Sequence, residues 1–541
     1  MRTLDSGNRP AHNAGVNLGT KRFPLDCGVS KKFFYANLLI WFLPHGRRVH
    51  FCATFAMVWL LVFGPLAGRA DDANDKTPQA DATVLIVGGG LTGLSTAYEL
   101  NKAGIDSLIL EVSPRLGGRV QSVRFKDGDT AEAHMEEYFA RSPAYKLLKE
   151  LQLPLAEDVA HSSVRLGGKI LPYRGEGNRD EYLRGVFSAE EAAAFLKWND
   201  RTWALYEKLH ASYYSGKPLP PELVALTKIS FDKFIARERL PTKVREWIRV
   251  TIEPETAIEW DEISALDGID EMRLFLDTPD GFGEKNYHVK GGNSKFTEAL
   301  AAHIGNRRPL VNALVTAIRQ TAESVTVRYL HDGYQYREAN AKYAVVTVPV
   351  SQLGRIQFDP GLSDEKKRAI ATTRFGSYIK VHFGLAPQAA KLWQENGESI
   401  LTLLSDSPAG SIYDATDLQD APADRDRILT LLIHARFARA LVGHSADDIR
   451  QHSAESLDAL FPGVKRHIKF AEIFVYPEAV AYWPIELGRS RFDTLANKLR
   501  EPQGRLYIGG DMTEDSHSEG AVVAALRMSK AIADRETNRK R

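Results

Sequence analysis

A stretch that begins at residue 84 constrains the fold more than any other part of the chain. The apolar run Val84–Val87 is followed by a glycine motif with the spacing G-x-G-x-x-G. Residues with helical composition continue over Leu91–Ala103, and a second apolar run, Ser107–Leu110, comes next. Short apolar runs are typical of buried parallel strands. The order therefore predicts a βαβ unit with a glycine-rich turn after its first strand.

The glycines of this motif have separate roles when such a unit binds a dinucleotide. Gly88 makes the tight turn, and Gly90 lets the backbone approach a pyrophosphate. Gly93 lets the helix pack against the strand. The free N–H groups of the helix N-terminus, at Leu91 and Thr92, offer hydrogen bonds and a positive dipole end to the same pyrophosphate.

Two further features bear on which dinucleotide is bound. Glu111 ends the second strand about 20 residues after the motif, where a carboxylate can accept hydrogen bonds from a ribose 2′-OH. An acid at this place favours an unphosphorylated ribose, which NAD and FAD share. Gly117, Gly118 and Arg119 form a second glycine turn that ends in a cation. That turn would place another loop and an arginine beside the diphosphate of a long, extended cofactor, so FAD is the better reading.

Size and charge limit the classes of protein that remain. The 541 residues, of which 44% are hydrophobic, are enough for a large core divided over two domains. Lys+Arg 70 against Asp+Glu 69 leaves almost no net charge, so nothing indicates a nucleic-acid partner. The two cysteines, Cys27 and Cys52, lie near the start of the chain. No zinc motif or disulfide framework is possible in the remainder, and we expect no metal.

The N-terminal region is typical of an export signal. Arg47 and Arg48 precede the apolar run Phe51–Leu66, and the small residues of Ala67–Ala70 follow. We expect cleavage after Ala70 and a periplasmic location, and the paired arginines hint at twin-arginine export. Two alternatives remain open: an uncleaved membrane anchor, and a true start further along the chain.

The rest of the chain has an interleaved organisation. A hairpin is expected over 120–133, helices over 186–250, three strands between 313 and 337, a buried run over 343–350 and a terminal helix after a glycine-rich segment. We expect an α/β fold with a Rossmann-type FAD-binding domain interleaved with a mixed-sheet and helical substrate domain. The predicted divisions are a signal or anchor at 1–70, a linker at 71–81, an FAD-binding domain at 82–136, 287–350 and 481–535, and a substrate domain at 137–286 and 351–480.

Several motifs in the same order make the chain resemble the flavin-containing amine oxidase family, which includes monoamine, polyamine and L-amino-acid oxidases. They cover essentially residues 82–535 and read VGGGLTGLSTAYELNKAG, VKGGNSKFTEAL, NALVTAI, VVTVPVSQLGRIQFDPGLSDEKKRAI, FGSYIKVHFGL and LYIGGDMTEDSHSEGAV. The resemblance implies FAD-dependent oxidation of an amine. The carbon next to the nitrogen would give a hydride equivalent to flavin N5, and the imine would be hydrolysed to an aldehyde.

The resemblance also implies roles for individual residues. Lys380 corresponds to the lysine that hydrogen-bonds a water at flavin N5. Trp483 falls on one of two aromatic positions that stand on the flavin face, and His517 falls on the other, where the family often has an aromatic residue. Tyr482 takes the place of the cysteine that links covalently to FAD in monoamine oxidases, so FAD should be held noncovalently.

Further cofactor contacts follow from the same resemblance. The Val315 backbone is expected at the adenine. Asp511, after Gly510, is expected near the pyrophosphate or the ribityl chain. Gly520 and Ala521 are expected near the isoalloxazine.

The substrate class depends on the segment after the second glycine turn. Amino-acid oxidases place a carboxylate-binding arginine there, whereas this chain has Glu132, Glu136 and Glu137 with His134. A glutamate that faces the site would favour a cationic amine over an amino acid. The alternative is that these are solvated charges at a helix start, since acids favour helix N-termini.

Other readings of the same motifs stay open. The chain could be an L-amino-acid oxidase, a protoporphyrinogen oxidase-like or desaturase-like flavoenzyme, or a flavin-binding protein without turnover. The electron acceptor could be oxygen or a redox protein. The particular amine and the oligomeric state do not follow from the sequence.

Overall fold

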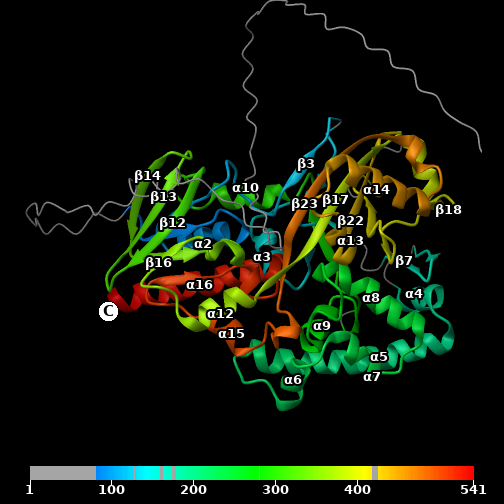
Figure 1. Ribbon diagram of the computed structural model, residues 1–541, viewed down its shortest axis with the longest axis horizontal. Coiled ribbons are helices and arrows are strands. Elements are labelled where there is room, and N and C mark those ends of the chain that lie inside the picture. The colour runs from blue at the N-terminus through cyan, green and yellow to red at the C-terminus, as the bar shows by residue number, and fades with distance from the viewer. Residues whose placement is uncertain are drawn as a thin grey trace, which may run out of the picture. The chain divides into compact units, whose positions relative to one another are not determined.

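The computed structural model describes residues 81–540 except 127, 159–161, 174–177, 280 and 417–423 (Figure 1). The predicted export signal therefore lies outside the described residues. The described residues belong to one compact unit, and the division into two domains stays a prediction. Within this part of the chain, no helix is both long enough and apolar enough to cross a bilayer.

A four-stranded parallel sheet contains the predicted βαβ unit. Its strands run in the order β2-β1-β15-β24, all in parallel. They are β1 (Val84–Val87), β2 (Ser107–Leu110), β15 (Tyr343–Val346) and β24 (Leu506–Ile508). Helices α2 (Leu91–Lys102) and α16 (Ser518–Lys540) contribute to the hydrophobic core on this sheet. The apolar runs are thus confirmed as strands, and distant segments of the chain supply them.

A second sheet lies beside the end of β2. It has the order β14-β13-β12-β16, and its hairpins confirm the three strands expected between 313 and 337. The Ala313 N–H donates to the Glu111 carbonyl at 2.8 Å, which joins this sheet to the first one. The strands are β12 (Ala313–Gln320), β13 (Val325–His331), β14 (Gln335–Ala341) and β16 (Gln357–Asp359).

A seven-stranded sheet makes the other half of the fold, with the order β23-β17-β22-β21-β20-β7-β8. Its long strands, β17 (Arg374–Leu385) and β23 (Ile468–Tyr482), are antiparallel. Its other strands are β7 (Ser163–Leu166), β8 (Lys169–Leu171), β20 (Leu403–Ser405), β21 (Ser411–Asp414) and β22 (Arg427–His434). Helices α13 (Ala435–Leu441) and α14 (Ala446–Leu460) pack into the same core.

Helices follow one another between residues 179 and 272, which confirms the helical pattern seen over 186–250. In Figure 1 they lie to the right, below β17 and β22, whereas α2, α16 and β12–β14 lie to the left. They are α4 (Arg179–Val186), α5 (Ala189–Leu209), a π-helical turn (His210–Tyr214), α6 (Pro221–Leu226), α7 (Phe231–Arg237), α8 (Thr242–Thr256) and α9 (Ala265–Met272). Buried tryptophan and phenylalanine side chains of α5, α7 and α8 form a core together with β7 and β8.

Short elements connect these layers. The hairpin expected over 120–133 is present as β3 (Ser122–Arg124) and β4 (Thr130–Glu132). The segment after it contains β5 (Tyr138–Phe139) and no helix before α3 (Pro143–Glu150), so the alternative of solvated charges at a helix start is wrong. The remaining elements include β6 (Leu155–Asp158), β11 (Asn286–Val289), α10 (Ser294–Ala302), α11 (Val350–Leu353), α12 (Asp364–Thr372) and α15 (Thr494–Arg500).

Candidate active site

The glycine turn after β1 fits the diphosphate of a dinucleotide. Gly88 has φ +109°, and a Cβ on Gly93 would lie 2.0 Å from the Gly88 carbonyl oxygen. Only glycine therefore lets α2 start so close to the strand. No side chain caps α2 at Gly90, so the first N–H groups of the helix, including those of Leu91 and Thr92, keep their capacity to bind an anion.

The second glycine turn lies directly against the first. The Gly117 N–H donates to the Gly89 carbonyl at 2.8 Å. Gly118 has φ +58°, and a Cβ there would be 3.1 Å from the Gly90 Cα. A Cβ on Gly90 itself would meet nothing closer than 3.9 Å. The two turns thus form one cradle with room over Gly90.

The acid at the end of β2 completes this cradle. One oxygen of the Glu111 carboxylate accepts from the Gly89 N–H at 2.6 Å, and the other accepts from the Ser113 N–H at 2.8 Å. A carboxylate held in this way keeps lone pairs for ribose hydroxyls. Val315, on β12, lies two residues after the Ala313 N–H that bonds Glu111. The predicted adenine and ribose contacts therefore lie at one edge of the parallel sheet.

The predicted contacts from the C-terminal motif lie around an ion pair. The Arg119 guanidinium donates to the Asp511 carboxylate and, at 2.7 Å, to the Ala479 carbonyl. Asp511 is buried, and its second oxygen accepts no hydrogen bond from the described residues. Such an acceptor needs a donor, and a hydroxyl of FAD is one candidate. The cradle and this acceptor both fit the cofactor.

Gly520 and Ala521 belong to the first turn of α16. A Cβ on Gly520 would lie 2.3 Å from the Asp515 carboxylate, so glycine is required there for packing. Gly510 is extended at φ 167° and donates from its N–H to the Thr513 hydroxyl at 3.3 Å. Whether these residues contact the flavin stays a prediction.

Lys380 lies in the middle of β17 and is only 1% exposed. Its ammonium donates to the carbonyls of Glu132, at 3.2 Å, and His134, and to the carboxylate of Glu136. An ammonium has three N–H groups, and all three meet protein acceptors here. The Lys380 ammonium therefore does not reach solvent. Its predicted role at a water on N5 stays a prediction, and would require one of these bonds to be exchanged.

In the acidic segment expected near the site, Glu132 is buried and Glu136 and Glu137 are half-buried. The Tyr413 hydroxyl donates to Glu136, and Glu137 accepts from the Asn286 amide. Burial and, to a lesser extent, the Glu136 charge raise the pKa of Glu132 to about 7. Burial also holds the pKa of His134 well below its usual value.

Trp483, Tyr482 and His517 line one small cavity, and their roles at the flavin stay a prediction. The cavity lies at the C-terminal end of β23, and its other lining residues are Thr256, Ile263, Asp267, Glu271, Val480, Ala481, Arg491 and Ser516. Trp483 is 4% exposed. Burial, followed by the charges of Glu262 and Glu486, raises the pKa of Tyr482 to about 12.

Acidic side chains of α8 and α9 lie close to His517 at this cavity. His517 lies 3.8 Å from a carboxylate oxygen of Glu255 and 3.8 Å from one of Glu271. Burial raises the pKa of Glu271 to about 7 and that of Asp267 to about 6. The sequence interpretation did not include these three acids. The sequence signal for two of them is their spacing, since Asp267 and Glu271 lie four residues apart in the short helix α9.

The lysine cluster and the cavity are separate but linked. The Tyr378 ring lies 6.1 Å from the His134 ring, and its hydroxyl donates to the Pro254 carbonyl and lies 3.2 Å from that of Glu255. Tyr378 therefore stands between the Lys380 cluster and the end of α8. Groups of three or more acids, histidines and cysteines arranged for a metal ion are absent from the described residues.

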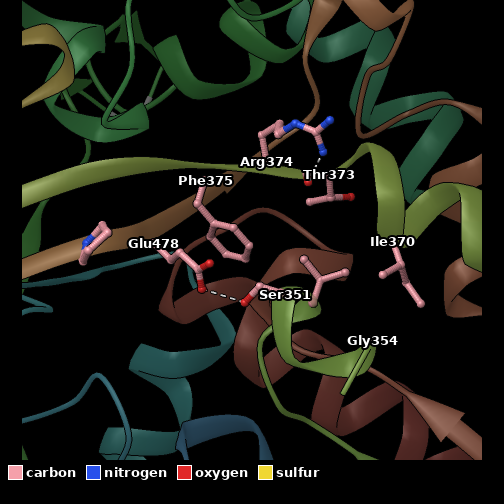
Figure 2. A pocket seen from close by; sticks show the side chains of 9 residues that line it. Ser351, Gly354, Ile370, Thr373, Arg374, Phe375 and Glu478 are labelled. Carbon is pink, nitrogen blue, oxygen red and sulfur yellow. Dashed lines mark hydrogen bonds between the residues drawn. The ribbon is translucent and has the colours of Figure 1, made fainter. Parts of the chain in front are cut away.

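A second hollow, a groove of about 400 Å³, lies between α11, the end of α12 and the neighbouring ends of β17 and β23 (Figure 2). Glu478 accepts from the Ser351 hydroxyl at 2.6 Å, and Arg374 donates to the carbonyls of Ala371 and Thr373. The charged groups of this groove already have partners. The cavity at Trp483 is the better candidate for catalysis.

Comparison with known proteins agrees with this geometry. The family model for flavin containing amine oxidoreductase matches residues 91–533. A protein of Dictyostelium discoideum described as "Probable flavin-containing monoamine oxidase A" is 26% identical over 84% of this chain and 98% of its own length. An L-amino-acid oxidase of Vipera ammodytes ammodytes is 22% identical over 84% of this chain and 92% of its own length.

Solved structures show the same fold. A putrescine oxidase bound to putrescine superimposes with a TM-score of 0.69 at 21% identity, over 83% of this chain and 98% of that one. The family match covers the part of the cofactor cradle from Leu91 onwards and the cavity at Trp483. The chain belongs to the flavin-containing amine oxidoreductases, and it is an FAD-dependent enzyme that oxidises amines.

Proposed function

We propose that the enzyme oxidises a small cationic amine without a carboxylate, whose ammonium occupies the small cavity between Trp483 and His517. One observation carries this proposal. Asp267 and Glu271 line the cavity, are each about 95% buried, and each has one oxygen that accepts no hydrogen bond from the described residues. Buried acceptors without donors are costly, and an ammonium supplies three donors and the opposite charge.

The raised pKa values of these acids support a cation as ligand. Burial raises the pKa of Glu271 to about 7 and that of Glu255 above its usual value. Near neutral pH part of this cluster therefore holds protons that it gives up when a cation arrives. Binding of the amine would release protons from the site.

The cofactor site follows from the cradle described above. Gly88, Gly90, Gly93 and Glu111 would hold the diphosphate and ribose of FAD. Bound FAD supplies the chemistry, since the flavin takes the hydride equivalent from the carbon next to the amine nitrogen. The described residues contain no cysteine, so FAD is held without a thioether link.

A second candidate is oxidation of an amino acid, and Arg491 favours it. This arginine lines the cavity and is 2% exposed, where a substrate carboxylate could meet it. However, its guanidinium already pairs with Asp270 and lies 3.5 Å from Glu271. With its charge compensated in this way, Arg491 is better suited to hold the acids of α9 in place.

The deciding experiment mixes the holoenzyme with substrates in the absence of oxygen and follows flavin absorbance near 450 nm. Each amine is paired with the amino acid from which it differs only by a carboxylate, such as cadaverine with lysine and phenethylamine with phenylalanine. We expect the amines to bleach the flavin and the amino acids not to. Bleaching by the amino acids alone would overturn the proposal in favour of amino-acid oxidation, with Arg491 binding the substrate carboxylate.

A variant that removes one negative charge tests the role of the acids that line the cavity. Glu271→Gln should weaken amine binding at least tenfold, because a buried charge-assisted hydrogen bond contributes about 1.5–3 kcal/mol. Glu298→Gln, at an exposed position of α10, is the matched control and should change nothing. Equal amine affinity in the two variants would contradict the role of Glu271.

We also propose that the protein is exported to the periplasm and that its electrons pass to oxygen or to a redox protein. The support for export is the arginine pair, the apolar run and the small residues of the first 70 residues. Membrane attachment through the same segment is the alternative. Fractionation of cells and the mass of the mature protein would test this, with cleavage after Ala70 expected. Admitting oxygen to the bleached enzyme would separate the two acceptors.

A further inference from the structure

His517 has one ring nitrogen that is open for proton transfer. Its Nδ1 lies 2.8 Å from the Asp515 carbonyl oxygen. A carbonyl only accepts, so Nδ1 must carry a hydrogen. The contact therefore selects the tautomer in which Nε2 has the free lone pair.

Nε2 is buried and has no hydrogen-bond partner among the described residues. The nearest carboxylate oxygen, that of Glu255, is 3.8 Å away, beyond hydrogen-bond reach. Two acceptors at this separation can both receive N–H groups of one ammonium, since its donors diverge. His517 also lines the cavity in which the substrate is proposed to bind.

The position of Glu255 relative to the imidazole is set by β17. Ala257 has φ 60° and ends α8, and its carbonyl accepts from the Ser377 N–H at 3.3 Å. The Tyr378 hydroxyl lies 3.2 Å from the Glu255 carbonyl. The end of α8 is thus tied to a long central strand, so the Glu255 carboxylate is held near the ring.

The charges that face His517 come from several elements. Glu255 lies on α8, Glu271 lies on α9, and Asp515 precedes α16; Arg273 pairs with Asp515 at 3.9 Å and with Glu519 at 3.2 Å. Burial by itself would lower the pKa of His517, but Glu271, Asp515 and Glu255 outweigh it and raise that pKa above 6.5. An imidazolium formed here is stabilised by its surroundings.

We propose that Nε2 of His517 takes the proton from the substrate's ammonium before the hydride leaves, while Glu255 receives a second N–H. The N–H bond of the ammonium breaks, its electron pair stays on the nitrogen, and the proton forms a new bond to Nε2. The amine is then neutral, and its lone pair can assist loss of the hydride from the neighbouring carbon. This inference rests on the proposed function, because it needs an amine in the cavity.

The proposal makes the reaction depend on pH in a defined direction. His517 must be neutral to accept a proton, so the rate of flavin bleaching should rise with pH through its raised pKa. Glu255→Gln removes a negative charge that raises this pKa. The pH range over which the bleaching rate rises should then move to lower pH by roughly one unit or more.

The test measures anaerobic bleaching of the holoenzyme by an amine between pH 5 and 10. His517→Phe keeps an aromatic wall and should lower the rate at neutral pH by about 10²–10⁴-fold. The steep rise of its rate should then lie near pH 10, where the substrate amine itself titrates. His444→Phe, at an exposed position after α13, is the control and should keep the wild-type profile.

Several outcomes would overturn the inference. If the bleaching rate of His517→Phe rises over the same pH range as that of the wild type, another group takes the proton. If Glu255→Gln lowers the rate at every pH without moving that range, its role is structural. Should His517→Phe fail to bind FAD, His517→Gln takes its place in the same assay. If no amine bleaches the wild-type flavin, it is the proposed function that fails.

Discussion

The ammonium of Lys380 illustrates how much a single buried charge depends on its neighbours. Replacing it with Met removes the donor to the carbonyls of Glu132 and His134 and leaves the Glu136 carboxylate without its cation, with the Tyr413 hydroxyl still donating to it. We expect Lys380→Met to lower the free energy of unfolding by about 3 kcal/mol or more, as for other broken buried pairs. Urea unfolding would measure this, with Lys391→Met at an exposed position as control. Equal midpoints for the two variants would contradict it.

Glu132 should make stability depend on pH. Its pKa is about 7 in the folded protein against 4.5 as the ordinary value, mainly because of burial. Between these values the folded state binds a proton that the unfolded chain has released. The group's stabilising contribution is therefore present below pH 4.5 and is lost as pH rises through 7, by about 3 kcal/mol in all.

The variant Glu132→Gln tests this directly. It carries no titrating group at residue 132, so its free energy of unfolding should fall less between pH 5 and pH 7 than that of the wild type. The difference in slope is the measured quantity, since Glu271, Asp267 and Glu262 titrate in the same direction in both proteins. An equal fall in the free energy of unfolding between pH 5 and pH 7 in both proteins would show that the pKa of Glu132 is not raised.

At the scale of elements, the contact between α2 and the turn after β1 decides whether FAD binds. A Cβ on Gly93 would lie 2.0 Å from the Gly88 oxygen, so Gly93→Ala must push the helix start away from the strand. We expect a protein purified without flavin absorbance. Gly354→Ala is the control, because a Cβ there meets nothing within 4 Å. A Gly93→Ala protein that is purified with bound flavin would contradict the claim that residue 93 must be glycine for FAD to bind.

At the scale of the whole molecule, distant segments complete one parallel sheet. A chain truncated after Arg500 lacks β24 and α16, so β15 becomes an edge strand and the core that α16 shares with α2 is exposed. We expect this chain to bind no FAD and to be degraded rapidly in limited proteolysis. A chain truncated after Thr537, within the last turn of α16, should still bind FAD and resist limited proteolysis. Survival of the shorter chain would show that the sheet tolerates loss of its last strand.

Local patterns were enough to predict the cofactor half of the fold. The run Val84–Val87, the glycines after it and Glu111 act through neighbours in the βαβ unit, so their spacing carries the information. The same holds for the hairpins of β12, β13 and β14, whose alternation and turns are local. The family resemblance added Lys380, Trp483 and His517, which no local pattern would single out.

What lies around those three residues was decided only by the tertiary structure. Glu136 meets Lys380, and Glu255 and Glu271 meet His517, although each pair is far apart in the sequence. The helix-start alternative for 131–139 was wrong because β4 belongs to the hairpin with β3 and β5 pairs with β11, a strand much further along the chain. Burial and charge act through space, whereas periodicity and turn chemistry act along the chain. The nucleotide-binding unit therefore follows from local sequence patterns, whereas the chemistry beside it follows from the packing of α8, α9 and β17.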